Sequence, residues 1–138
     1  MTMKPTEQPT DAERGNLTLA LIILTVGIML MIGLVVDGAG KIQAGERANQ
    51  LASSAARVAA NSLTGKAITT GSLELDGIAA RNAAQNYLAA AGVNGTAFVV
   101  NNTVTVTVKD EYDTVFLSII GIDTLTGQGT ASARLING

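Results

Sequence analysis

The 138-residue chain contains no cysteine, no histidine and no tryptophan. It can therefore form no disulfide, no thiolate or imidazole metal site, and no catalytic pair in which histidine activates serine or cysteine. Aromatic residues are scarce as well, with two Phe and two Tyr, so an apolar pocket for a small molecule would lack the side chains that usually line one. These absences predict a protein that is not an enzyme and that uses no cofactor, metal or small-molecule substrate.

Charged residues are also few, and 9 basic residues nearly balance 11 acidic ones. Because neither sign forms a long run, the sequence predicts no nucleic-acid surface and no polybasic membrane patch. Asp110, Glu111 and Asp113 lie close enough in sequence to suggest oxygen ligands for a hard cation. Their spacing fits no complete calcium loop and Lys109 lies beside them, so we interpret them as part of a solvated loop.

The apolar residues are concentrated in one segment, residues 17–36, which read LTLALIILTVGIMLMIGLVV and include no charged side chain. A helix of this length rises about 30 Å, which matches the hydrocarbon thickness of a bilayer, and it satisfies its own backbone groups in lipid. We therefore predict a transmembrane helix at 17–36, a disordered cytoplasmic tail at 1–16 and a single extracytoplasmic domain at 37–138.

Two other interpretations of the apolar segment stay open. The first is a secretory signal peptide, with Gly38 and Gly40 as small residues near a cleavage site, although such a peptide usually has a shorter apolar core of about 7 to 15 residues. The second is a buried core helix, which the rest of the chain would have to cover. Basic residues nearly balance across the segment, so charge decides its orientation only weakly. We expect the N-terminus in the cytoplasm, because Arg14 at the membrane edge is typical of an uncleaved signal anchor.

Helical spacing continues beyond the apolar segment. Asp37 and Lys41 stand four residues apart, which predicts an ion pair on one helix face at the membrane edge. Residues 41–63 then carry a stripe of mostly small side chains at helical spacing. The stripe consists of Ala44, Ala48, Leu51, Ala55 and Val58. Such a stripe permits close packing, either on the chain's own sheet or on a helix of a partner protein.

Glycines interrupt this continuation at positions 38, 40 and 45. Each weakens a helix by up to about 1 kcal/mol relative to alanine. They are consistent with a hinge between the membrane and extramembrane parts, and equally with a weakness that a continuous helix tolerates. We interpret five later glycines as turn residues: Gly92, Gly95, Gly121, Gly127 and Gly129.

A second helix is predicted after a short loop. Ser72 offers an N-cap, and the helical spacing runs through Ala91 to the stop at Gly92. Further along, residues 114–120 place their apolar side chains at helical spacing in a short amphipathic turn that Gly121 ends.

The region between and after these helical segments alternates with period two, which is typical of strands. Residues 97–100 and 103–108 flank Asn101-Asn102 and predict a β-hairpin, because asparagine tolerates the left-handed conformations of a two-residue turn. The valines of the second strand face the core in this prediction: Val104, Val106 and Val108. Residues 130–135 alternate again and predict a third strand. The expected fold is α+β, with a long N-terminal helix, a second helix and a small antiparallel sheet of about three strands.

The order of these features resembles a known family. Arg14-Gly15 precedes the apolar helix, GLVVDG at 33–38 ends it, and an alanine-rich helix follows. The alternating TVTVTV at 103–108 and the apolar VFLSIIGI at 115–122 come next. This arrangement is similar to the TadE/TadG-like proteins of tight-adherence (Flp) pilus systems. The resemblance implies a pilin-like architecture and a bitopic inner-membrane pseudopilin or minor-pilin-like protein, which assists pilus assembly and contacts lipid and other pilus subunits.

The resemblance also bears on processing. In pilin-like members a leader peptidase cuts after a glycine, and a glutamate at the fifth mature position supports subunit packing. Gly15 and Asn16 would form that junction here, but the fifth position after Gly15 is Ala20. We therefore expect an uncleaved, TadG-like accessory protein. The alternative function is a membrane-anchored extracytoplasmic ligand-binding or sensor module.

Overall fold

The computed structural model describes residues 11–64 and 73–134, and the side chains of 15–62 and 77–134. The elements, in order, are α1 (Asp11–Thr64), α3 (Leu73–Ala90), β1 (Asn94–Val100), β2 (Thr103–Asp113), the 3-10 helix η1 (Leu117–Ile120) and β3 (Thr124–Arg134). The predicted α+β class, with a long apolar helix, a second helix and a three-stranded sheet, is confirmed.

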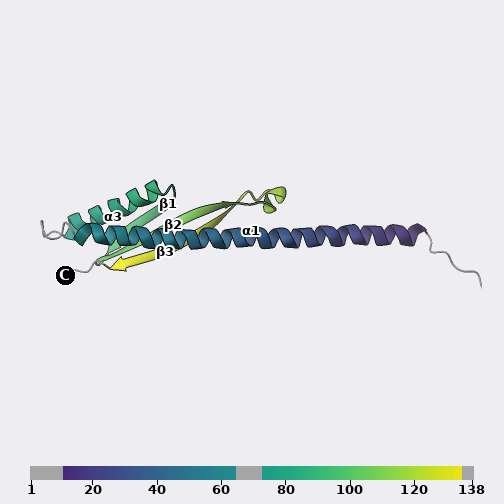
Figure 1. The fold of residues 1–138 in the computed structure, drawn as a ribbon, viewed down its shortest axis with the longest axis horizontal. Helices are drawn as coiled ribbons and strands as arrows, with labels where there is room; N and C mark the ends of the chain where they lie inside the picture. Colours follow the sequence, from purple (N-terminus) through teal and green to yellow (C-terminus); the bar gives the residue numbers. More distant parts are fainter. Residues whose placement is uncertain (1–10, 65–72, 135–138) are drawn as a thin grey trace, which may run out of the picture.

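Helix α1 is continuous over 54 residues, which corresponds to a rod of about 80 Å. It passes through the three glycines at 38, 40 and 45 without a break, so of the two interpretations offered the tolerated weakness applies. The helix begins at Asp11, inside the expected tail, and the first ten residues of that tail lie outside the described part. Its C-terminal half packs on the sheet and α3, whereas its N-terminal half extends beyond them (Figure 1).

The sheet has the order β1-β2-β3, and both pairs are antiparallel. Asn101 and Asn102 connect β1 and β2 with φ of 46° and 66°, the left-handed pair that a type I′ hairpin turn requires. The predicted hairpin is therefore confirmed. Thr105 and Thr107 lie on the face of β2 opposite its buried valines. Their hydroxyls form hydrogen bonds with those of Ser132 and Thr130 of β3.

Strands β2 and β3 are longer than the sequence suggested. The polar residues 109–113 continue β2, and they pair with residues 124–128 at the start of β3. Polar side chains are compatible with a strand here because the neighbouring strand supplies the ladder of hydrogen bonds. The extension carries the loop between β2 and β3 well beyond the rest of the sheet, along α1 (Figure 1).

The core lies between one face of α1, the sheet and α3. The α1 face consists of small residues with one exception: Gly33, Asp37, Gly40, Ala44, Ala48, Ala52, Ala55, Ala56 and Ala59 are all buried. The alanines from Ala48 to Ala59 share one core cluster with Ala80, Ala84 and Leu88 of α3 and with the three valines of β2, which are fully buried as predicted.

The buried face of α1 differs in part from the predicted stripe. Ala44, Ala48 and Ala55 lie on it, but Leu51 is half-buried and Val58 is exposed. The prediction followed an average spacing of 3.5 residues, whereas an α-helix turns once in 3.6, so a strict seven-residue repeat drifts around the helix. The buried positions follow the helix and continue backward to Asp37 and Gly33.

Helix α1 approaches β3 so closely that side chains are excluded between them. A Cβ atom at Gly127 would overlap backbone atoms of Ala44 and Gly45, and one at Gly129 would overlap those of Ala48 and Asn49. The interpretation of Gly95, Gly127 and Gly129 as turn residues is wrong, because they lie within strands. These three are required for close approach, and of the five glycines interpreted as turn residues Gly92 and Gly121 adopt positive φ.

Candidate functional site where the apolar helix meets the sheet

Asp37 is the one charged residue on the buried face of α1 and has no exposed surface. It directly follows the apolar segment, at the level where the far end of the sheet reaches the helix. A buried carboxylate is costly unless it is fully hydrogen-bonded. Its partners therefore define the chemistry of this junction.

Three consecutive backbone amides of the β2–β3 loop donate to the Asp37 carboxylate. The N–H of Val115 lies 2.8 Å from Oδ1, and those of Phe116 and Leu117 lie 3.0 and 2.7 Å from Oδ2. The hydroxyl of Tyr112 also favours the charged form of this carboxylate and contributes to its lowered pKa. These amides stand at the start of η1, where helical geometry leaves N–H groups without partners in the helix. Asp37 thus caps η1 from a distant part of the chain.

The same contacts control the charge of Asp37, which lies outside the apolar segment 17–36. Burial raises the pKa of the Asp37 carboxyl, but hydrogen bonds from the amides of Val115, Leu117 and Phe116 and from Tyr112 outweigh it, and the pKa is lowered from its ordinary value. Hydrogen bonds to the ionised form favour that form. The carboxylate is therefore negatively charged at neutral pH, and the amide dipoles stabilise this charge.

Two glycines, one on either side of Asp37 along the buried face, admit the aromatic side chains of the loop. A Cβ atom at Gly33 would lie 2.6 Å from Cβ and 2.8 Å from Cγ of Phe116, and a Cβ atom at Gly40 would overlap the Tyr112 ring. The pattern Gly-x-x-x-Asp-x-x-Gly at the end of the apolar segment is the sequence signal for this docking. From the sequence, Gly40 was interpreted as a hinge or as a tolerated weakness of the helix, and its contact with Tyr112 was not predicted.

Hydrogen bonds join the two ends of the loop between β2 and β3, and a glycine ends its 3-10 helix. The N–H of Thr114 donates to the carbonyl of Asp123 at 2.9 Å, and its hydroxyl donates to the carbonyls of Ile122 and Asp123. Gly121 ends η1 with φ of 87°, in agreement with the predicted turn. Residues 114–122, which we call the η1 loop, form a compact unit docked on α1.

Asp37 binds this loop in place of its predicted partner Lys41. Lys41 is exposed, and among the described side chains the ion pair within 4 Å joins Arg47 and Asp110, at 3.8 Å. The reason is directional: Asp37 faces the η1 loop, where three backbone amides donate to its oxygens. Because the guanidinium side chain of Arg47 is largely exposed, the pair with Asp110 contributes little to stability.

The other predicted site residues do not join this cluster. Gly15 and Asn16, the possible leader junction, are exposed in the first turns of α1. Asp110, Glu111 and Asp113 lie in the extended end of β2 and not in a loop. No group of three or more His, Cys, Asp or Glu suited to a metal ion occurs in the searched, described part of the chain.

The N-terminal half of α1 presents large apolar side chains on all sides. Within 17–36 only Gly33 is buried, where the η1 loop covers it. By length and composition this helix is suited to cross a membrane. The alternative of a buried core helix does not apply, because the segment is uncovered, whereas a signal sequence near the N-terminus passes the same test.

Residues 15–62 match the model of a family described as Tad, putative Flp pilus-assembly TadE/G-like. Searches of curated proteins and of solved structures gave no match. The matched segment includes the apolar half of α1 and the whole buried face from Gly33 to Ala59, with Asp37 on it. The resemblance that the sequence suggested is confirmed over this segment: through nearly the whole of its long helix, this chain matches the TadE/G-like family of Flp pilus assembly.

Proposed function

We propose that this protein is a non-catalytic, single-pass membrane component of tight-adherence (Flp) pilus assembly, of pseudopilin or minor-pilin-like character. The observation that carries the proposal is the family match over residues 15–62, in a helix whose first half is apolar and uncovered. The family match supports the pilus system, and the uncovered apolar half supports the membrane.

The proposed mechanism is tethering with a fixed geometry. Residues 17–36 hold the chain in the inner membrane, and residues 37–138 form the domain outside, with the N-terminus in the cytoplasm. Because α1 is continuous and the η1 loop is bound to Asp37, the sheet is held at a defined height relative to the span. The domain then meets other pilus-assembly subunits in one orientation.

The small-residue face of α1 is occupied by the chain's own sheet, so contacts with partners use other surfaces. In the membrane, van der Waals packing between helices drives association, and the apolar half of α1 offers side chains for it on every side. A shallow hollow lined by Met31, Ile32, Val35 and Val36 lies on that same half. Its position in the proposed span gives no support to the alternative of a solute-binding or sensor module.

We propose further that the leader is retained, because Ala20 stands where pilin-like members carry an acidic residue. Mass spectrometry of the membrane-extracted protein should then find an N-terminus upstream of Gly15. An N-terminus at Asn16 would instead place the chain among processed pseudopilins.

The membrane assignment is tested by charge in the span. The double substitution Leu24→Asp and Ile28→Asp should release the protein from carbonate-washed membranes and abolish pilus formation, because each Asp at a span centre costs about 2.5 to 3.5 kcal/mol. Phe98→Asp is the matched control, since Phe98 is as exposed as Leu24, at 60% against 59%, but lies on the sheet. This control should stay in the membrane fraction. A wild-type protein that carbonate removes would overturn the proposal.

Topology and pilus role need separate measurements. An alkaline phosphatase fused after Gly138 should be active, and an inactive fusion with an active cytoplasmic reporter would reverse the orientation. Deletion of the coding gene should abolish pili, with rescue by the wild-type chain. Unchanged pili after deletion would contradict a role in assembly.

A further inference from the structure

We propose that the η1 loop is a second membrane contact of this protein, lying in the outer interface of the bilayer beside the end of the span. The inference rests on the proposed transmembrane helix. Its occupant is lipid: the boundary between headgroups and acyl chains.

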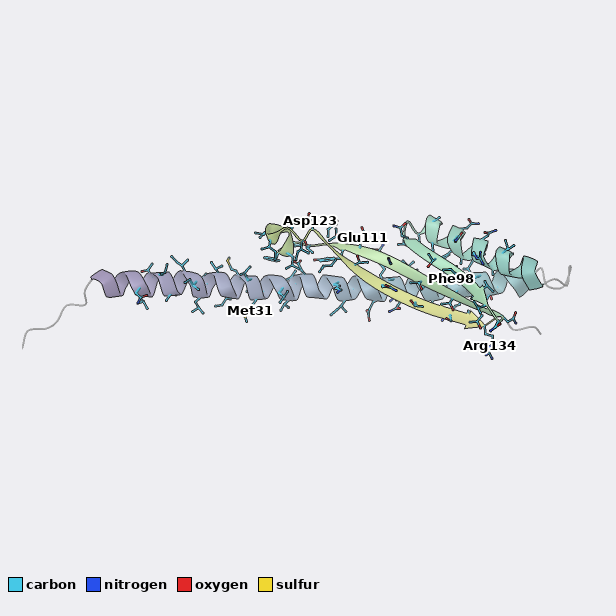
Figure 2. All side chains as sticks on the ribbon, turned by 180° about the vertical axis from the view of Figure 1, so that it is seen from behind. Met31, Phe98, Glu111, Asp123 and Arg134 are labelled. Carbon is cyan, nitrogen blue, oxygen red and sulfur yellow. The ribbon has the colours of Figure 1, made fainter. Side chains whose placement is uncertain are left out.

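The first observation is the level at which the loop lies. Phe116 of the loop packs on Gly33, which is three residues before the end of the apolar segment at position 36. Three helical residues correspond to about 5 Å along the axis, so the loop overlaps the last turn of the span. Figure 2 shows Glu111 and Asp123 at the end of the sheet that reaches toward the apolar half of α1, with Arg134 at the opposite end.

The second observation is the surface that the loop presents. No charged residue occurs from 114 to 122, and Asp113 and Asp123 bracket this stretch. Most of its large side chains face outward: Val115, Ile119, Ile120 and Ile122 are exposed, with Ile119 at 80%. Phe116 packs on Gly33 and leaves 38% of its surface exposed beside them. This patch adjoins the bare apolar surface of α1 and continues it. Exposed apolar patches of this kind mark sites that contact another protein or a membrane.

The third observation concerns the polar groups of the loop. In lipid, backbone N–H and C=O groups must find partners inside the protein. Asp37 accepts from three consecutive amides, and the amides of Ile119, Gly121 and Ile122 donate to carbonyls of the same loop. The Ser118 hydroxyl donates to the carbonyl of Val115.

These observations together favour lipid over water around the loop. The continuity of its apolar surface with the exposed apolar half of α1 favours lipid over another protein subunit. Amides of a loop in water would be satisfied by solvent and would not need a buried carboxylate. Here the charge of Asp37 lies beneath the loop, facing the amides, while the outer surface carries no charge and is mainly apolar, with Ser118 as its exposed polar side chain. Interfacial segments bury their apolar face about 5 to 10 Å into the boundary of headgroups and acyl chains. That depth agrees with the overlap of the loop and the last turn of the span.

The absence of tryptophan from the chain allows a direct test with single-tryptophan variants. Ile119→Trp reports on the loop, Met31→Trp on the span and Phe98→Trp on the outer face of the sheet. Full-length protein carrying one variant each is placed in vesicles of phosphatidylcholine and phosphatidylglycerol, with bromine on the acyl chains near the headgroup. We expect bromine to quench most of the fluorescence of Ile119→Trp and Met31→Trp, and to leave that of Phe98→Trp unchanged.

The outcomes separate the loop from the span. If Met31→Trp is not quenched, the proposed membrane span and the loop contact both fail. If Met31→Trp is quenched but Ile119→Trp emits like Phe98→Trp, the loop is in water and the present proposal is overturned, while the proposed function stands. Blue-shifted but unquenched emission from Ile119→Trp would show contact with protein and would also overturn it.

A second loop position guards against local misfolding. Ile120 is also exposed, at 63%, so Ile120→Trp disturbs no packing and should be quenched like Ile119→Trp. Circular dichroism of each variant should match the wild type. Quenching at neither position, in variants that retain the wild-type spectrum, would overturn the proposal.

Discussion

The two halves of α1 belong to one continuous helix but have opposite surfaces. The half at 17–36 carries large aliphatic side chains all round and leaves them uncovered, whereas the half that follows buries a face of glycine and alanine against the sheet. Small residues are needed where a backbone comes close, and β3 approaches at Gly127 and Gly129. The comparison shows how side-chain size along one helix differs between an exposed apolar surface and a surface packed against another backbone. Large side chains occur on the first, and glycine and alanine on the second.

The largest expected effect comes from adding a side chain where the packed half meets β3. A side chain in Gly129→Val would overlap backbone atoms of Ala48 and Asn49, and a backbone cannot rotate away as a side chain can. We expect the free energy of unfolding of the domain formed by the sheet, α3 and the packed half of α1 to fall by about 3 kcal/mol. Urea unfolding of the detergent-solubilised full chain, followed by circular dichroism, measures this.

Gly45→Ala is the glycine control for that experiment. A Cβ atom at Gly45 meets nothing within 4 Å, so this variant should gain up to about 1 kcal/mol from helix propensity. If both variants unfolded at the same urea concentration, the close approach of α1 and β3 would be contradicted.

The next effect sets the two halves directly against each other. Ala52→Leu overpacks a fully buried position on the packed half and should lower the free energy of unfolding of the same domain by about 1 to 3 kcal/mol. Leu24→Ala on the bare half removes side-chain volume where no part of the chain packs, and it should change that free energy by less than about 0.5 kcal/mol. Equal effects of the two variants, by the same urea measurement, would remove the distinction between the halves.

A smaller, local effect is expected at the junction between the halves. Asp37→Asn keeps the shape but removes the charge that binds three loop amides. Amide hydrogen exchange at Val115, Phe116 and Leu117 should become as fast as in an open loop, with the hairpin at Asn101 and Asn102 unaffected. Slow exchange at those three amides in the variant would contradict the capping role.

This junction should also respond to pH. Because the pKa of Asp37 is lowered in the folded protein, its stabilising contribution is complete above the ordinary carboxyl pKa of about 3.9. The contribution is lost as the pH falls through the lower folded-state value. Protection of the loop amides should therefore decrease only in strong acid in the wild type, and Asp37→Asn should abolish that dependence.

The smallest expected effect is at the ion pair on the water-facing side of the packed half. Arg47→Ala removes the partner of Asp110 and should change the free energy of unfolding by about 0 to 1 kcal/mol, since exposed pairs contribute little. The same urea experiment measures it. A loss as large as that of Ala52→Leu would show that the pair, and not the small-residue face, holds α1 to the sheet.

Sequence patterns predicted those parts of the molecule that local forces control. The hairpin followed from Asn101-Asn102, because a two-residue turn depends on those residues themselves. The buried valines of β2 followed from strict alternation. The length of β2 did not, because residues 109–113 are strand only through their pairing with β3.

The sequence predicted one residue of the candidate site but not its partners, because those partners come from a distant part of the chain. Asp37 was identified as the residue that ends the apolar segment, but the three amides that bind it lie 78 to 80 positions away in sequence. Helical spacing therefore suggested Lys41, which is four residues distant. The sequence did contain a signal, because a glycine lies on either side of Asp37 on one helix face. Its meaning became clear only from the structure, in which Phe116 and Tyr112 pack against these glycines.

The sequence by itself determined the long apolar helix, the second helix and the alternating strands, because these depend on side-chain periodicity and turn residues close along the chain. Only the tertiary structure decided which glycines permit close packing, which face of α1 is buried and what binds Asp37. Those properties depend on contacts between segments that are far apart in sequence, and local sequence patterns do not specify which segments will be in contact.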